Sequence, residues 1–145
     1  GLTFDSTGDL YGMTEYGGST NCGNGCGVLF KLSESGGVWN ETLPHMFTGG
    51  SDGRYPLGGL AFDGAAMYGV TEYGGGSGCG SGCGIVFKMT LSPFNYATLY
   101  AFQNGNDGAS PLNVTPLLAD DGLLYGTAQG GGPFEGVVYS VTTTP

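Results

Sequence analysis

The sequence has few basic residues, one histidine and no long apolar run. Three Lys+Arg stand against twelve Asp+Glu, a net charge of −9. This balance repels phosphate backbones, so we expect no nucleic-acid binding and no anionic membrane surface as a partner. No stretch approaches the roughly 18 apolar residues of a membrane span. With His45 as the only histidine, a histidine zinc cluster is excluded, and a Ser-His-Asp triad would have to pass through it.

Helical periodicity is also missing, whereas glycine is abundant. No segment repeats its apolar residues every 3.6 positions over a helical length, and the 32 glycines follow no Gly-X-Y period, which excludes collagen. Glycine at this density disfavours helices and is typical of tight turns between short strands. Composition therefore predicts an all-β protein.

An internal repeat dominates the sequence. LYGMTEYGG at 10–18 returns as MYGVTEYGG at 67–75, and CGNGCGVLFKL at 22–32 returns as CGSGCGIVFKM at 79–89, both offset by 57 residues (67 − 10 = 79 − 22 = 57). A loop of pattern F-x-[GN]-G-[SN]-D-G-x-x-P occurs at 47–56 and 102–111. A third copy has LLADDGLLYGTAQGGG at 117–132 and GVVYSV at 136–141, and has lost five residues where the others hold cysteines. We expect a single repeat domain with units of 1–58, 59–116 and an incomplete 117–145.

Each unit is predicted to form four short antiparallel strands. In the first unit we expect strands at Leu2–Asp5, Leu10–Tyr16, Val28–Leu32 and Thr42–Phe47, because apolar and polar residues alternate there between turn residues. Four strands per unit of this length is typical of β-propeller-like blades, with a β-sandwich or a β-solenoid as the alternatives. The expected core pairs are Leu2 and Leu60, Phe4 and Phe62, Val28 and Ile85, Phe30 and Phe87, and Leu32 and Met89.

The pattern L-Y-G-x-T-x-x-G-G…C-G-x-G-C-G-x-V-F-K-L resembles the GloVer (Gloeobacter/Verrucomicrobia) tandem repeat. The likeness covers nearly the whole chain and is weaker at 124–141, where Thr127-Ala128-Gln129 replaces the M/V-T-E string. That family occurs in bacterial surface and secreted proteins, often with a C-terminal sorting anchor. The resemblance implies repeat architecture and an extracellular or cell-surface location, and it implies no known reaction. Because the chain opens inside the repeating pattern, we expect it to be a processed or excised part of a longer precursor.

The four cysteines form two CxxxC pairs. Pairing within each copy, Cys22 with Cys26 and Cys79 with Cys83, is the simplest of three possibilities, because the third copy lacks both cysteines together. The glycines between them permit a tight loop. The alternative is a shared Cys₄ zinc site, which would need the two loops to touch. We expect disulfides and an oxidising compartment.

Two further groups of residues could form sites. Glu15 and Glu72 are equivalent and could face each other as a glycosidase pair, but Gln129 takes their place in the third copy, so we expect no enzyme. The loops around Asp52 and Asp107 are rich in oxygen atoms, which leaves calcium as a weak alternative to side-chain-stabilised turns. No other cofactor or metal is expected.

Sugars are the remaining ligands that the residues suggest. Tyr16 and Tyr73 flank Gly-Gly turns, and together with Trp39, the only tryptophan, they could stack on a glycan or fill the core. Asn40 and Asn113 fit the glycosylation sequon.

We expect an extracellular structural or assembly protein, whose partners are copies of itself joined head-to-tail through open strand edges into a homopolymer or filament. The alternative to the homopolymer is that the chain is a fragment, and that the further repeat units needed to cover its open strand edges lie on the same polypeptide. The alternative function is a glycan-binding or adhesive module, and the least favoured is a glycoside-acting enzyme.

Overall fold

The computed structural model describes residues 1–131 and 136–144. These residues form three antiparallel sheets and one short 3-10 helix, η1 (Thr20–Cys22), which confirms the all-β class. The shortened segment of the third unit lies partly outside the described residues, as does the chain end at 145. Among the residues described, no helix is both long and apolar enough to cross a membrane.

Each sheet is a meander of strands that are consecutive in sequence. Sheet 1 contains β1 (Leu2–Phe4), β2 (Leu10–Thr14), β3 (Val28–Ser35) and β4 (Val38–Met46) in that order. Sheet 2 contains β5 (Ala61–Phe62), β6 (Ala66–Thr71), β7 (Ile85–Leu91) and β8 (Phe94–Ala101). Sheet 3 contains β9 (Leu117–Leu118), β10 (Leu123–Ala128) and β11 (Val137–Thr142). The antiparallel four-stranded unit that the repeat predicted is therefore present twice in full.

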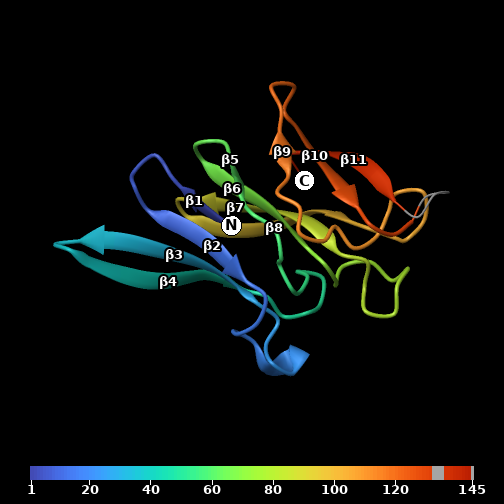
Figure 1. The fold of residues 1–145 in the computed structure, drawn as a ribbon, viewed down its shortest axis with the longest axis horizontal. Coiled ribbons are helices and arrows are strands. Elements are labelled where there is room, and N and C mark those ends of the chain that lie inside the picture. The colour runs from blue at the N-terminus through green and yellow to red at the C-terminus, as the bar shows by residue number, and fades with distance from the viewer. Residues whose placement is uncertain (132–135, 145) are drawn as a thin grey trace.

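The three sheets follow one another side by side (Figure 1). Apolar side chains pack between neighbouring sheets in two buried clusters. Sheet 2 is covered on both faces. What we call the leading face of a sheet packs against the preceding sheet and, in sheet 2, carries Leu60, Met67, Ile85, Phe87 and Met89. The trailing face packs against the following sheet and, in sheet 2, carries Ala66, Tyr68, Val70 and Val86. The two cores thus come from alternate residues of the same strands.

No sheet formed by the described residues packs against the leading face of sheet 1. Leu2 is 64% exposed, whereas its counterpart Leu60 is 4% exposed. Phe4 is also exposed, and Phe30 and Leu32 are only half-buried. The prediction of equivalent burial in both copies is therefore wrong for Leu2, Phe4, Phe30 and Leu32, because no sheet of the described chain covers them, whereas Val28 is buried as predicted.

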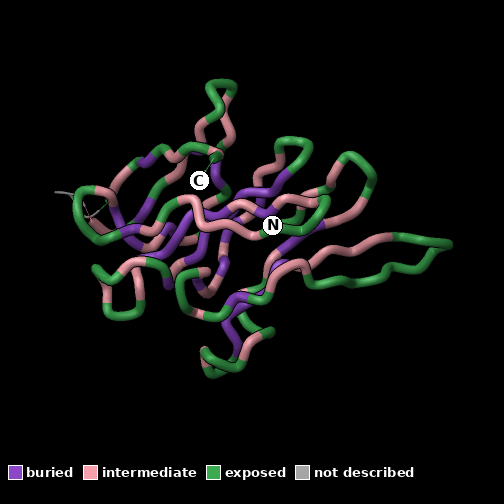
Figure 2. The backbone as a smooth tube through the Cα atoms, turned by 180° about the vertical axis from the view of Figure 1, so that it is seen from behind, coloured by how far each residue is buried: buried purple, intermediate pink, exposed green. Residues whose placement is uncertain are grey.

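The β3–β4 hairpin is longer than predicted. The two strands continue to pair beyond Leu32 and Glu41, through Ser33–Asn40 to Ser35–Val38. The end of the hairpin is exposed on both faces (Figure 2). Cross-strand pairing continues here without a buried face, so the alternation used to predict the strands could not reveal its length.

A loop carries the chain from each sheet onto the next in the same way both times. The Tyr55 amide donates to the Cys26 carbonyl at 2.9 Å, and the Ser110 amide donates to the Cys83 carbonyl at 2.7 Å. Just before them, Arg54 forms an antiparallel bridge with Tyr73, and Ala109 forms the same bridge with Gly130. These two loops, at 47–56 and 102–111, are called the crossing loops below.

Candidate functional site

The aspartates of the crossing loops organise the turns. The Asp52 carboxylate accepts hydrogen bonds from the Thr48 amide at 2.9 Å and the Thr48 hydroxyl at 2.5 Å. The Asp107 carboxylate accepts from the amides of Gln103 and Gly105 at 2.8 and 3.0 Å. Partial burial raises the pKa of Asp107, but these bonds, with one from the Tyr100 hydroxyl, lower it overall. The two carboxylates thus stabilise their turns as expected of aspartate side chains, and calcium at these loops stays a prediction.

His45 is part of the same turn. Its Nε2 lies 3.1 Å from the Asp52 carboxylate, and its ring stacks on Tyr96 of sheet 2 with centroids 3.9 Å apart. Burial lowers the pKa of His45 and outweighs the attraction of Asp52. The equivalent residue in the second copy is Tyr100, whose hydroxyl donates to Asp107 at 2.9 Å. His45 thus stabilises the first crossing loop against sheet 2.

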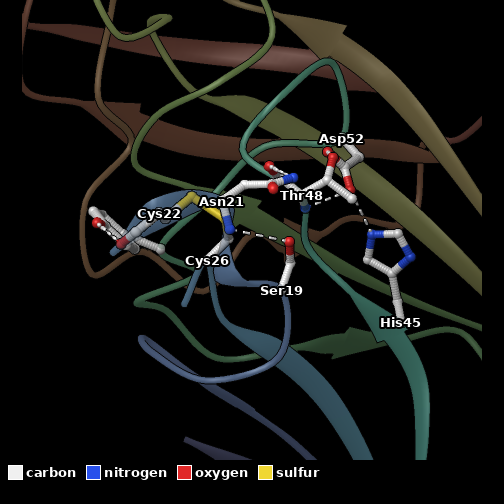
Figure 3. The surroundings of a disulfide bond; sticks show 8 residues. Ser19, Asn21, Cys22, Cys26, His45, Thr48 and Asp52 are labelled. Atoms are coloured by element: carbon white, nitrogen blue, oxygen red, sulfur yellow. Dashed lines mark hydrogen bonds and ion pairs between the residues drawn. A yellow bond between two sulfur atoms is a disulfide. The ribbon is translucent and has the colours of Figure 1, made fainter. Parts of the chain in front are cut away.

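Both predicted disulfides are present. Cys22 is bonded to Cys26 and Cys79 to Cys83, and the described residues include no free cysteine, so the cysteines do not form a Cys₄ zinc site. The first disulfide lies against the first crossing loop, where the Asn21 side chain donates to the Thr48 carbonyl at 3.3 Å (Figure 3). A Cβ placed on Gly49 would lie 2.7 Å from the Cys22 sulfur, so glycine is needed for this close approach.

The structure brings Tyr16 and Tyr73 to one end of the sheets. Tyr55 lies between them, with its ring centroid 5.5 Å from that of Tyr16 and 6.1 Å from that of Tyr73, both edge-to-face. Tyr16 is exposed, and the other two are half-buried. Three rings from three segments thus form one surface cluster, which we call the tyrosine cluster.

The two candidate glutamates accompany this cluster. Glu15 raises the pKa of the Tyr16 phenol, and Glu72 raises that of Tyr73, because a nearby carboxylate stabilises the protonated phenol. The negative charge of Glu72 also contributes to the raised pKa of Tyr16. The site is therefore acidic around its tyrosines.

The other predicted residues lie elsewhere. Trp39 is on β4 near the hairpin tip, opposite Glu34, whereas Tyr16 lies at the other end of sheet 1, just beyond the Thr14–Val28 pair. Asn40 and Asn113 are both exposed. Trp39 is thus separate from the tyrosine cluster, and the use of either asparagine for glycosylation stays a prediction.

Sequence reasoning missed Arg54 and Tyr55. The guanidinium carbon of Arg54 lies 5.2 Å from the ring centroids of both Tyr55 and Tyr73, which gives it two cation–π contacts. The sequence did contain a hint, because the two variable positions of the crossing-loop pattern are Arg-Tyr in the first copy and Ala-Ser in the second.

Beside Arg54 lies an open hollow of about 430 Å³. It is bounded by Gly49, Gly50 and Ser51 of the first crossing loop and by Gly80, Ser81 and Gly82, which lie between Cys79 and Cys83. Gly74, Gly75 and Gly76 also line it. The first disulfide supports one wall, and the second closes the turn that forms the other.

Comparison with known proteins gives a family and no function. No curated protein and no solved structure matches the chain. The model of the Gloeobacter/Verrucomicrobia repeat matches residues 1–145, so the chain belongs to this repeat family.

Proposed function

We propose that the chain is a non-enzymatic structural repeat module of the cell exterior, which stacks head-to-tail on further copies of itself. The observation that carries the proposal is the open leading face of sheet 1. This face is equivalent to the leading face of sheet 2, which is buried against the trailing face of sheet 1. The trailing face of another sheet would therefore be a suitable partner for it.

The residues of the open face have buried or partnered counterparts. Phe30 lies over Gly12 as Phe87 lies over Gly69, but only Phe87 is fully buried. Trp39 pairs with Glu34 across the β3–β4 hairpin, and the equivalent pair in sheet 2 is Phe94 with Leu91. The Lys31 Nζ of sheet 1 lies 6.0 Å from the centroid of the Phe94 ring. Covering a large apolar side chain contributes about 1.5–3 kcal/mol, so several together give a substantial drive for association.

The trailing face of sheet 3 is the complementary end. Val138 and Leu117 are exposed there at 78% and 67%, whereas Val86, the counterpart of Val138, is buried under sheet 3. Because the two end faces differ, a contact between them is head-to-tail and leads to a ring or a filament. A contact through the free edge of β11 would also be head-to-tail and stays a prediction.

The disulfides are compatible with secretion, where oxidising conditions preserve them. A non-enzymatic role is supported by the engagement of His45 and Asp52 in bracing a loop. The glycan alternative concerns the opposite end of sheet 1.

Sedimentation velocity over a wide concentration range tests the proposal. We expect the wild-type chain to form larger species as concentration rises, and Phe4→Glu to stay monomeric because it puts a charge on the open face. Val38→Glu is the matched control, since Val38 is equally exposed, at the hairpin tip. A wild-type chain that is monomeric throughout, or a Phe4→Glu variant that associates as the wild type does, would overturn the proposal.

A further inference from the structure

Arg54 is the one basic side chain that the described part of the protein leaves without a polar partner. Lys31 is paired with Asp9 at 2.5 Å, and Lys88 Nζ donates to the Thr143 carbonyl at 3.1 Å. Arg54 has no carboxylate within ion-pair distance among these residues, and its Nε is buried with no acceptor. A buried donor without an acceptor costs about 1–3 kcal/mol, so the fold itself leaves the polar atoms of Arg54 unsatisfied.

The fold does not need an arginine at this position. Ala109 occupies the equivalent place, makes the same bridge to the next sheet and is buried. Tyr55 is likewise replaced by Ser110, although both have a left-handed backbone, with φ of 56° and 51°. A bulky aromatic residue is unfavourable in that conformation, so Tyr55 is explained better by what its ring does than by the turn.

The surroundings restrict the ligand to a monoanion. The chain has a net charge of −9, and Glu15 and Glu72 accompany the neighbouring tyrosines. A single guanidinium can balance one negative charge and can hold a carboxylate with two parallel hydrogen bonds. A sulfate or phosphate dianion would bring a second charge that no other side chain here neutralises.

The hollow suits a polyhydroxylated ligand. Its walls are glycine backbone and the hydroxyl-bearing Ser51 and Ser81, with no apolar side chain that would hold a peptide residue. Arg54, which lines the hollow, contacts Tyr55 and Tyr73 of the tyrosine cluster, whose rings are of the kind that stack on sugars.

We propose that Arg54 and this hollow bind the carboxylate of a uronic-acid residue in an acidic polysaccharide. Arg54 would hold the carboxylate, the glycine-rich walls would admit the ring close to the backbone, and the tyrosine cluster would contact the adjacent sugar. This site lies at the opposite end of sheet 1 from Trp39 and does not depend on stacking between copies.

Isothermal titration calorimetry with trigalacturonic acid tests the site. We expect binding to the wild-type chain, at least a tenfold loss in Arg54→Ala, and a smaller loss in Tyr55→Ser. Ala109 and Ser110 show that the fold accepts both replacements, and circular dichroism verifies that each variant is folded. Lys88→Ala is the charge-matched control and should bind as the wild type does.

Three further ligands separate the chemistries. The methyl ester of trigalacturonic acid and the neutral maltotriose should bind at least tenfold more weakly than the acid, because neither carries a carboxylate. An acidic peptide should also bind more weakly. The proposal is overturned if the wild type does not bind the acid, if Arg54→Ala binds it equally, or if the ester, maltotriose or the peptide binds as tightly. The Phe4→Glu variant should bind normally, so failure of stacking and failure of this site can be told apart.

Discussion

Phe87 and Phe30 occupy the same position in successive repeats, each with its ring against a glycine of the neighbouring strand, yet only Phe87 is fully buried. Phe87 touches Phe47, the first residue of the crossing loop that follows sheet 1, with ring centroids 5.5 Å apart. Among the residues that the structure describes, no aromatic ring packs against Phe30 in this way. The difference in burial between Phe87 and Phe30 shows how much a stacked sheet shields this position from solvent.

Truncation of these two residues should have unequal effects. Phe87→Ala should lower the free energy of unfolding by roughly 3–5 kcal/mol, because it leaves a cavity between two sheets. In dilute solution Phe30→Ala should cost about half as much, since water can reach its outer side. Chemical denaturation at low protein concentration measures both, and equal losses would contradict the assignment of the open face.

His45 should make stability fall as the solution becomes mildly acidic. Burial lowers its pKa in the folded state below the ordinary value of 6.5, so below about pH 6.5 the unfolded chain binds the proton first. The free energy of unfolding should therefore decrease from pH 7 to about pH 5. His45→Gln keeps every carboxylate and should show a flatter profile, whatever its absolute stability. Parallel profiles for the two proteins would refute the lowered pKa.

Removal of the Asp52 carboxylate should loosen the first crossing loop. Asp52→Ala loses the bonds from Thr48 and His45, and we expect a cost of about 2 kcal/mol, which is typical of hydrogen bonds to a charged group. Asp120→Ala is the control, because Asp120 is exposed, and it should be near neutral. Thermal unfolding measures both. Millimolar Ca²⁺ should leave the midpoint unchanged, and a clear rise that Asp52→Ala abolishes would favour a calcium site instead.

Reduction of the disulfides should act locally. Each bridge closes a loop of only a few residues, so its loss should remove little stability and leave the sheets intact. Hydrogen exchange after reduction should increase first at 22–26 and 79–84, while the β-sheet circular dichroism persists. Trigalacturonate binding should weaken in Cys79→Ser/Cys83→Ser, since that bridge closes one wall of the hollow. Global unfolding on reduction would contradict this picture.

The repeat made the sheets predictable, but not what lies between them. Alternation in Val28–Leu32 located β3, and the copy-internal pairing of Cys22 with Cys26 followed from the motif. Arg54 and Tyr73 could not be paired from sequence, because their contact depends on how the crossing loop docks on the next sheet. The exposure of Leu2 was equally hidden, since sequence shows that a residue suits an interface and not whether a partner covers it.

Trp39 allows the most direct test of stacking, because it is the sole tryptophan, lies on the leading face of sheet 1 and is 49% exposed. Its fluorescence should be measured with acrylamide, a neutral quencher, as protein concentration rises. The account predicts a small shift of emission to shorter wavelength and a small fall in quenching in the wild type, because the counterpart Phe94 keeps 43% exposure under a stacked sheet, while Phe4→Glu shows neither change. A Trp39 that remains equally accessible at every concentration would contradict it.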